Sequence, residues 1–475
     1  MDNLDYFLTK KFFRIVPKKF YAILPPSTLR SIRFGSIKNQ YNYLKRTQQL
    51  GLKNLRRIQL KKLKSLVRFA FHNIPFYKKK IREAGITPYD INSLADLEKI
   101  PIITKNEVRK NLGEIIFARK SYYGIFTTSG STGKPFRAPY SWESIKWRDA
   151  ALQRVFSWSG FNPTHDRSMG ITFPPSYINS PVTAKRYIFS SLKHIISNRL
   201  YLDPKTITDN ELMELLKLMN KFQPKLLRTS PHLLVFLQRF GKKYNLEFPE
   251  SLRCIYVGGE AFPYKMLKKE SKTEIFELYG AIETGLQASD CREHSGLHMN
   301  MENSIIQTVN DGEALNYGEK GEIIITDFTN SDTPLIRYNI EDLGIIAEPE
   351  KCSCGMQLLK LDGIAGRKID TLITTNGKAI NDIDGIISDI NELSFQRGIE
   401  QFQIIQNKIT DVTVKVVPTN NFSSDTEKII MMSLKKVLGR EVKVKIKVVK
   451  RIPHGKKFRY IISKVKNQKY LRTFE

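Results

Sequence analysis

Short apolar runs of strand type alternate with helical patterns through the middle of this 475-residue chain, and this alternation limits the fold more than any other feature. The strand-like runs are YGIFTTSG, SMGITFPP, KLLRTS, LRCIYVGGEA and IFELYGA, separated by helical stretches such as Trp142 to Trp158 and Glu211 to Phe222. Strands that alternate with helices pair in parallel as βαβ units. We therefore predict an α/β protein built on a largely parallel sheet.

Further elements flank this core. Residues 52 to 84 have apolar side chains at three- and four-residue spacing, which predicts an amphipathic helix that Pro75 should end or kink. Thr104 and Glu107, three positions apart, are typical of the capping box at a helix start. After the parallel core, GEIIITDF and PLIRYNIEDLGIIA predict two strands separated by a turn, an antiparallel addition to the sheet.

A second, smaller domain is expected at the C-terminal end. A single hydrophobic core seldom exceeds roughly 250 to 300 residues, and the two glycines of LDGIAGRK mark a flexible junction. After it, QFQIIQN, DVTVKVVP and VKVKIKVV predict three strands, with a helix from Asp425 to Leu438 between the last two. We expect a basic N-terminal extension of unassigned structure over residues 1–50, a large domain over 51–366 and a small α+β domain over 367–475.

The formal net charge is +30, which attracts polyanions such as an anionic membrane surface, an acidic glycan or nucleic acid. A generally lysine-rich proteome would give the same value. Basic residues concentrate at residues 10–19, 53–82 and 435–469. The chain lacks an apolar run of roughly eighteen residues and a secretory signal, so we expect an intracellular, cytoplasmic protein, with peripheral membrane contact as one use of its charge.

The segment TTSGSTGKP, from Thr127 to Pro135, follows a predicted strand and is rich in glycine and small hydroxylated residues. Such a loop lets the backbone approach a ligand while N–H and O–H groups point at negative oxygens. It is not a Walker A loop, because the glycines before Lys134 are too close together and Pro135 stands where Ser or Thr would hold magnesium. Alone, the segment fits a phosphate-binding loop or an ordinary Gly/Ser turn.

Further motifs follow in a fixed order: YVGGEA, ELYGAIETG, RYNIEDLG, GRKID and HGKKFRYI. In order and type they resemble the core motifs of adenylate-forming enzymes, the superfamily of acyl-CoA synthetases, peptide-synthetase adenylation domains and luciferases. NIPFYKKKIREAG, LADLEKIPIITKNEVRKN, CREHSGLH and CSCG resemble phenylacetate-CoA ligase and its relatives from capsular-polysaccharide loci. The resemblance covers roughly residue 52 to the C-terminus. It implies a large N-terminal domain of layered mixed β-sheets with helices and a small mobile α+β C-terminal domain.

The resemblance also implies roles for individual residues. The ATP phosphates would be held by Thr127, Thr128, Ser129, Gly130, Ser131, Thr132, Gly133 and Lys134. The adenine and acyl pockets would be bordered by Gly258, Gly259 and Glu260, and Tyr279, followed by Gly280, would stack near adenine. Asp342 would accept hydrogen bonds from the ribose hydroxyls, Arg367 would lie beside the ribose and phosphate, and Glu283 would bind magnesium.

The reaction itself explains why cations are needed. A carboxylate that attacks the α-phosphate of ATP brings two anions together, so the site must supply cations and donors where charge develops. By the family pattern these are magnesium and a lysine of the C-terminal domain, Lys457 or Lys456, of which Lys457 fits the usual KFRYIISK ending better. One departure is Ile282, which replaces the usual hydroxyl before the motif glutamate. The lost donor is worth on the order of 1 kcal/mol, or about 1.5 to 3 with a charged partner.

Four cysteines are too few for a disulfide-stapled fold and suit a reducing compartment. Cys291, Cys352 and Cys354 with His298 offer three thiolates and an imidazole, a tetrahedral set for structural zinc. His294 is the competing nitrogen ligand. Cys254 lies in an apolar strand and is expected to be a buried structural thiol.

Together these features predict an AMP-forming ligase that makes an acyl-adenylate from a carboxylic acid and ATP and then transfers the acyl group to coenzyme A. Its cofactors would be ATP, Mg²⁺, coenzyme A and structural Zn²⁺, and the resemblance alone suggests a role in capsule or surface polysaccharide synthesis. Two alternatives are transfer to an amine on a glycan, and a non-catalytic protein of the same fold that binds an anionic membrane or glycan. We do not expect a nucleic-acid partner.

Overall fold

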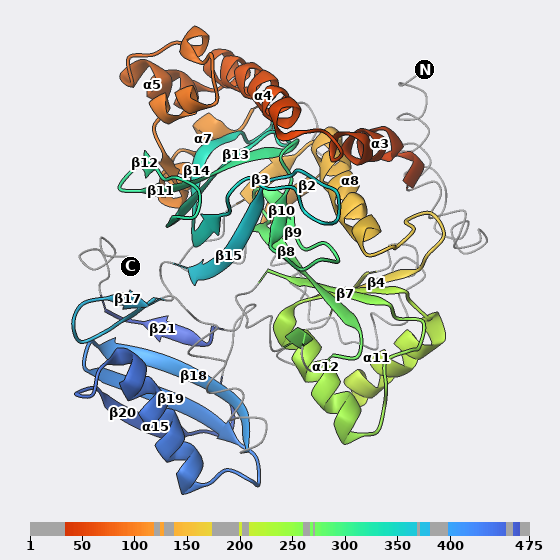
Figure 1. The fold of residues 1–475 in the computed structure, drawn as a ribbon, viewed down its shortest axis with the longest axis vertical. Helices are drawn as coiled ribbons and strands as arrows, with labels where there is room; N and C mark the ends of the chain where they lie inside the picture. Colours follow the sequence, from red (N-terminus) through yellow and green to blue (C-terminus); the bar gives the residue numbers. More distant parts are fainter. Residues whose placement is uncertain are drawn as a thin grey trace.

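The computed structural model describes residues 34–117, 124–127, 137–172, 199–201, 209–259, 267–268, 271–367, 371–380, 398–452 and 459–465. A long mixed sheet with helices forms the larger part of the molecule, and a small sheet with one helix lies beside it (Figure 1). Within the described part of the chain, no helix is both long and apolar enough to cross a membrane.

Thirteen described strands make up the long sheet, whose order is β12-β11-β13-β14-β15-β10-β9-β8-β7-β6-β4-β5, with β1 paired to β14. The parallel part, which the alternation of strands and helices predicts, comprises β5 (Arg199–Tyr201), β4 (Ser168–Thr172), β6 (Leu226–Thr229), β7 (Cys254–Gly258) and β8 (Glu274–Ala281).

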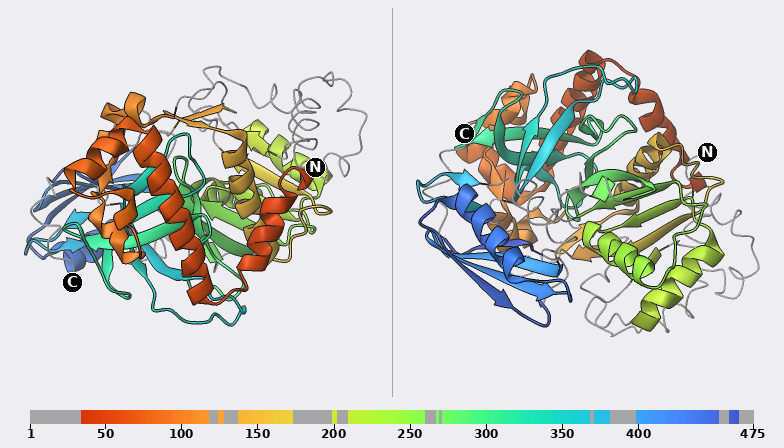
Figure 2. Two further views of the ribbon diagram at one scale, coloured as in Figure 1. Left: turned by 90° about the horizontal axis from the view of Figure 1, so that it is seen from above. Right: turned by 60° about the horizontal axis from the view of Figure 1, so that its bottom comes forward.

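The helices of the parallel part are α8 (Trp142–Trp158), α11 (Asp209–Phe222) and α12 (Pro231–Lys243). Successive side chains of a strand point to opposite faces of the sheet, and in this part apolar side chains on both faces pack against helices. Leu227, Ile255 and Val257 pack in one hydrophobic cluster with residues of α11 and α12. Cys254 and Tyr256 pack in another cluster with residues of α8. Figure 2 shows α11 and α12 together on one side of these strands.

The antiparallel part continues the same sheet and contains the two strands predicted from GEIIITDF and PLIRYNIEDLGIIA. Its strands are β9 (Gly285–Ser289), β10 (Leu297–Met299), β11 (Ser304–Asn310), β12 (Glu313–Ala314), β13 (Lys320–Asp327), β14 (Leu335–Ile346) and β15 (Lys360–Arg367). β13 and β14 are antiparallel neighbours, as expected. The prediction is wrong for the first strand-like run, YGIFTTSG: its strand β2 (Gly124–Thr127) is not in the parallel sheet but pairs antiparallel with β3 (Arg137–Tyr140) in a separate two-stranded sheet.

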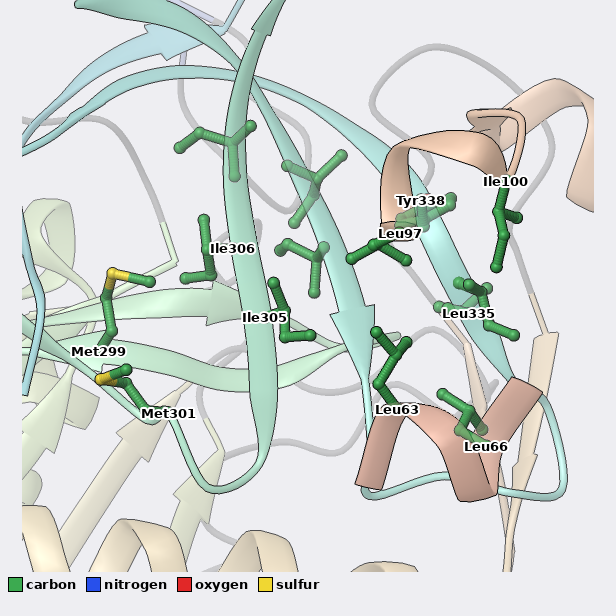
Figure 3. Packing of buried hydrophobic residues seen from close by; sticks show 14 of the residues in the cluster. Leu63, Leu66, Leu97, Ile100, Met299, Met301, Ile305, Ile306, Leu335 and Tyr338 are labelled. Carbon is green, nitrogen blue, oxygen red and sulfur yellow. The ribbon is translucent and has the colours of Figure 1, made fainter. Parts of the chain in front are cut away.

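A helical layer covers the antiparallel part. It contains α4 (Leu52–Asn73), α5 (Pro75–Glu83), the short turns η2 (Pro88–Asp90) and η3 (Ala95–Lys99), β1 (Ile103–Thr104), α6 (Lys105–Lys110) and α7 (Leu112–Ile115). Pro75 separates α4 from α5, and Thr104 and Glu107 form the predicted capping box. Leu63 and Leu66 of α4 face Leu335 and Leu97 in the core (Figure 3).

Part of the N-terminal extension, for which no structure is predicted from the sequence, forms a helix that packs on the large domain. Helix α3 (Lys38–Thr47) packs against α8, and Thr47 donates a 2.7 Å hydrogen bond to Glu302. Arg154 of α8 forms a 2.7 Å ion pair with the same carboxylate, and both side chains are fully buried. Breaking such a pair from one side leaves a buried charge without its partner, so these contacts fix α3 to the large sheet.

The C-terminal part has its own core. Its sheet has the order β20-β19-β18-β21, formed by β18 (Ile399–Lys408), β19 (Asp411–Pro418), β20 (Lys443–Val448) and β21 (Ile461–Ser463), with α15 (Ser424–Leu438) packed on it. The three strands and the helix agree with the sequence prediction. A two-residue pair, β16 (Leu372–Ile373) and β17 (Ala379–Ile380), precedes them.

Candidate active site and thiol–imidazole cluster

Glu283 lies in the turn between β8 and β9, at the edge of the parallel strands. The turn is held from both sides: the Tyr140 hydroxyl donates to the carbonyls of Ile282 (2.7 Å) and Glu283 (2.9 Å), and Arg148 donates to the Ile282 carbonyl (2.8 Å). The Arg148 guanidinium also stacks on the Tyr140 ring at 4.1 Å. The carboxylate is therefore presented by a rigid backbone.

The Glu283 carboxylate is only 3% exposed, and two side chains from other segments contact it. Lys105 forms a 3.2 Å ion pair with it, and the Tyr338 hydroxyl donates a 3.1 Å hydrogen bond to the same oxygen. Burial opposes ionisation, but the charge of Lys105 and these hydrogen bonds outweigh it and hold the pKa of Glu283 below its usual value. Glu283 is thus a buried carboxylate that stays charged.

Lys105 was not among the residues expected from the sequence. Strand β1 pairs with β14 so that Ile103 lies opposite Tyr338, and the capped start of α6 then points Lys105 at Glu283. The partners are 178 positions apart in the chain, so no local pattern connects them. The capping box fixed the start of the helix, and it was the only sequence signal near this lysine.

Asp342 and Tyr279 form a second polar pair. The Tyr279 hydroxyl donates to an Asp342 carboxylate oxygen at 3.1 Å, which joins β8 to β14. Arg367 lies directly opposite Asp342 in the β14–β15 register, and its side chain lies outside the described residues. Tyr279 and Asp342 are thus within hydrogen-bond distance although three strands lie between β8 and β14 in the sheet order, and Arg367 lies on β15, the strand next to β14.

The predicted glycines at the strand ends have steric reasons of their own. A Cβ atom on Gly258 would lie 2.3 Å from the Leu278 carbonyl oxygen, and one on Gly280 would lie 2.2 Å from that of Gly285. Gly259 has φ of 88°, a conformation that favours glycine. Close packing of β7, β8 and β9 therefore requires small residues beside the candidate site.

Several predicted site residues lie outside the described residues. They are Thr128, Ser129, Gly130, Ser131, Thr132, Gly133, Lys134, Glu260, Lys456 and Lys457. Ile282, the residue that departs from the family pattern, is described and is 43% exposed. An apolar side chain thus stands in contact with solvent directly beside the buried Glu283.

The four predicted zinc ligands come together. One ligand atom from each of Cys291, His298, Cys352 and Cys354 lies within 4.8 Å of the others. The Cys291 and Cys352 sulfurs are 3.9 Å apart, and the Cys354 sulfur is 3.4 Å from Nε2 of His298. Nδ1 of His298 faces the Leu358 carbonyl at 3.4 Å, which leaves Nε2 as the nitrogen directed at the thiols. This group is called the thiol cluster below.

His294, the competing nitrogen ligand, is used elsewhere. Its Nδ1 lies 3.1 Å from an Asp290 carboxylate oxygen, and its Nε2 lies 3.4 Å from Glu274. It adopts φ of 49° in the turn before β10. The structure therefore selects His298 over His294 for the cluster.

Burial raises the pKa of Cys291 to about 12 and lowers the pKa of His298 to about 4, whereas burial of Cys352 is outweighed by hydrogen bonds from neighbouring groups, which hold its pKa below the usual value. The imidazole is therefore neutral near pH 7, as a metal ligand must be. Cys254 lies apart, buried in β7 with its pKa raised by burial to about 11, and is the structural thiol that the sequence indicates.

Known proteins resemble this chain over most of its length, and one family model matches its C-terminal part. Residues 372–464 match the model of the CapK C-terminal domain. The chain is 25% identical over 343 residues to phenylacetate-coenzyme A ligase of Thermus thermophilus, covering 70% of this chain and 74% of that protein. It is 23% identical to the protein CapK of Staphylococcus aureus over 443 residues, covering 90% and 93% of the two chains.

A solved structure of 2-hydroxyisobutyryl-CoA ligase in the postadenylation state superposes with a TM-score of 0.72 and 17% identity, covering 90% of this chain and 94% of that one. The fold is therefore that of adenylate-forming CoA ligases, as the motifs predict. The expected resemblance to phenylacetate-CoA ligases is likewise confirmed, and the protein CapK is a further relative.

Proposed function

We propose that this chain, a relative of phenylacetate-coenzyme A ligases, is an ATP-dependent, AMP-forming ligase that converts a carboxylic acid to an acyl-adenylate and transfers the acyl group to coenzyme A. The observation that carries the proposal is the buried, ionised Glu283 in the turn after β8, because the same two strands, β8 and β14, supply the Tyr279–Asp342 pair and the Tyr338 contact to Glu283. Keeping a carboxylate charged in a buried site costs free energy. Such a carboxylate can serve the fold, as Glu302 does in its ion pair with Arg154, but the place of Glu283 in the motif turn after β8 favours a role in the reaction.

In this proposal each residue of the site has one task. Glu283 offers the hard oxygen ligand that magnesium prefers, and the ion neutralises phosphate charge when bound. Lys105 and Tyr338 keep that carboxylate ionised and oriented. Asp342, positioned by Tyr279, accepts hydrogen bonds from the ribose hydroxyls. Lys134 and Lys457 would supply the remaining positive charge, and the small domain would move between the two half-reactions.

The thiol cluster has a separate task. We propose that Cys291, His298, Cys352 and Cys354 hold a structural zinc ion, which joins the turn before β10 to the loop before β15. Three thiols and one imidazole suit zinc, and the four ligand atoms already lie close enough together to surround it. Lys105 and Tyr338, the two side chains that contact the Glu283 carboxylate, do not belong to this cluster. Zinc is therefore assigned no part in the reaction.

The biological setting rests on one relative. The match to CapK extends over 90% of the chain, whereas the match to the phenylacetate ligase covers 70%. The name CapK suggests capsule synthesis, so we propose that this chain serves capsule or surface polysaccharide synthesis in the cytoplasm, with an amine on a glycan as the alternative acceptor.

Pyrophosphate release from ATP and magnesium tests the proposal, with a panel of aryl, short-chain and amino acids, with and without coenzyme A. We expect release with one acid class, loss of activity in Asp342→Ala and Lys457→Ala, and a smaller change in the matched variant Lys456→Ala. A product that forms only with coenzyme A identifies a thioester, and one that forms only with an added amino sugar identifies the amine acceptor. Failure to release pyrophosphate with any acid, together with no ATP binding by calorimetry, contradicts the proposal.

A further inference from the structure

The positive charge of this chain is not evenly distributed. Between Asp5 and Glu83 there is no acidic residue, while 21 lysines and arginines occur in the same stretch. This one segment therefore supplies 21 of the 30 excess charges of the whole protein. A generally lysine-rich composition does not explain this, because it would not remove acidic residues from one segment alone.

Part of this segment forms a row of exposed basic side chains on helix α4. On α4, the exposed residues Lys53, Arg57, Lys61 and Arg68 and the half-buried Lys64 follow one another at intervals of three or four residues. At 3.6 residues per turn this spacing forms one stripe, about 22 Å long. The opposite face of the helix, which includes Leu55, Leu63 and Val67, is buried against the sheet. The stripe is called the α4 basic stripe below.

Within the part of the chain that the structure describes, little of this charge is neutralised. Among the described residues, the ion pairs include none from α4. The stripe residues instead make neutral contacts: Arg57 with the Asn54 side chain, Lys64 with Asn92, and Arg68 over the ring of Tyr89. On the adjoining α5, Lys78 and Arg82 are also exposed, while Lys79 pairs loosely with Glu83 at 3.9 Å.

The composition of the preceding segment favours lipid as the partner. Residues 6–33 contain seven lysines and arginines interleaved with large apolar residues, in KKFFRIV and KKFYAIL. Basic residues mixed with aromatic and aliphatic ones are typical of segments that bind the interface of anionic bilayers. A phosphate backbone would reward the lysines and arginines but not this apolar content.

We propose that the α4 basic stripe, with the exposed basic residues of α5, docks this protein on a membrane surface of anionic phospholipid. The α3–α4 layer and the C-terminal sheet lie on opposite sides of the molecule in Figures 1 and 2. Docking through α4 therefore leaves the small domain facing away from the bilayer and free to move. The assignment does not depend on the ligase reaction.

Co-sedimentation of the full-length protein with vesicles tests the proposal. One set of vesicles is phosphatidylcholine alone, and the other is equal parts of phosphatidylcholine and phosphatidylglycerol. The test variant is Lys53→Gln/Arg57→Gln/Lys61→Gln/Arg68→Gln. The matched control, Lys435→Gln/Lys443→Gln/Lys445→Gln/Lys447→Gln, removes the same four charges from exposed positions of the C-terminal domain.

We expect binding only to the vesicles with phosphatidylglycerol, and weaker binding at higher salt. The α4 variant should bind at least roughly tenfold more weakly, because each basic residue at the surface adds to the attraction. The control variant should bind within about twofold of wild type, since its charges lie away from the docking surface. Thermal unfolding checks that the variant is folded, and Arg57→Gln/Lys61→Gln serves if it is not.

Three results would overturn the assignment. No binding to either vesicle excludes a lipid surface. Equal losses in the two variants mean that only the overall charge matters. Tighter binding of duplex DNA than of vesicles, lost in the same α4 variant, identifies nucleic acid as the partner. Because none of these assays requires ATP turnover, their failure is distinguishable from failure of the ligase proposal.

Discussion

The carboxylate site around Glu283 and the thiol cluster are both buried, yet they differ in what completes them. In the thiol cluster, four ligand atoms face one another and the His298 ring is fixed by a backbone carbonyl. At Glu283, the carboxylate is held charged by Lys105 and Tyr338, beside the solvent-exposed Ile282. A group whose ligands satisfy one another is suited to holding the fold, whereas a charge kept ready near solvent is suited to meeting a substrate.

The strongest way to separate the two sites is Glu283→Gln. The amide keeps the shape but removes the charge, and we expect pyrophosphate release to fall about 10²- to 10³-fold, the range for losing one electrostatic group in a reaction centre. Zinc content should not change. The exposed Glu114→Gln is the matched control and should behave as wild type.

This variant also leaves the half-buried Lys105 without its partner, which is destabilising. The double variant Glu283→Gln/Lys105→Met should therefore regain thermal stability but not activity. Recovery of activity together with stability would mean that Glu283 serves only the fold.

The converse change is Cys354→Ser in the thiol cluster. We expect the loss of bound zinc and a fall in the free energy of unfolding of more than about 4 kcal/mol, since a lost metal site is among the most damaging changes. Turnover by the protein that stays folded at low temperature should be unchanged. Cys254→Ser, the control thiol, should keep its zinc; if it loses zinc equally, the cluster is misassigned.

The pH dependence distinguishes the two sites more finely. The pKa of Glu283 is held below its usual value, so its contribution to stability is complete above the unfolded pKa of about 4.3 and is lost as the pH falls through the folded pKa. In Lys105→Met, burial dominates and the pKa of Glu283 rises. The acidic limb of the pyrophosphate-release profile should move to higher pH. Lys110→Met, an exposed lysine on the same helix, should leave it in place, and superimposed profiles for all three proteins would contradict the role of Lys105.

The smallest effect is expected from Ile282→Thr, which restores the hydroxyl that the family pattern has. One added hydrogen bond is worth about 1 kcal/mol, or about fivefold in rate. The measurement is kcat and KM for the acid with the preferred acceptor, with Ile282→Val as the control that keeps the side chain apolar. A fall in rate in the threonine variant would mean that the apolar side chain contacts the substrate.

Most of the order of elements and the grouping of the thiol cluster could be predicted from local patterns. The alternation of strands and helices identified the parallel part of the sheet, the capping box located the start of α6, and the cysteines with His298 identified the thiol cluster. Lys105 could not be found this way, because its pairing with Glu283 depends on how β1 lies against β14.

The sequence preferred His298 to His294, and the fold supplies the reason, since the turn before β10 directs His294 toward Asp290. Helix α3 was missed for a related reason. Its position depends on the buried Arg154–Glu302 pair, whose two members lie 148 positions apart in the chain. Contacts of this kind between distant segments are invisible to sequence periodicity.

The most direct test of the reactive site is the exchange of labelled pyrophosphate into ATP, measured with the wild-type protein and one carboxylic acid at a time. Exchange requires that an acyl-adenylate form reversibly, and it needs neither coenzyme A nor any other acceptor. The account predicts exchange that depends on the added acid and is absent in Glu283→Gln. Exchange that proceeds equally well in Glu283→Gln would contradict the assignment of this carboxylate as the centre of the reaction.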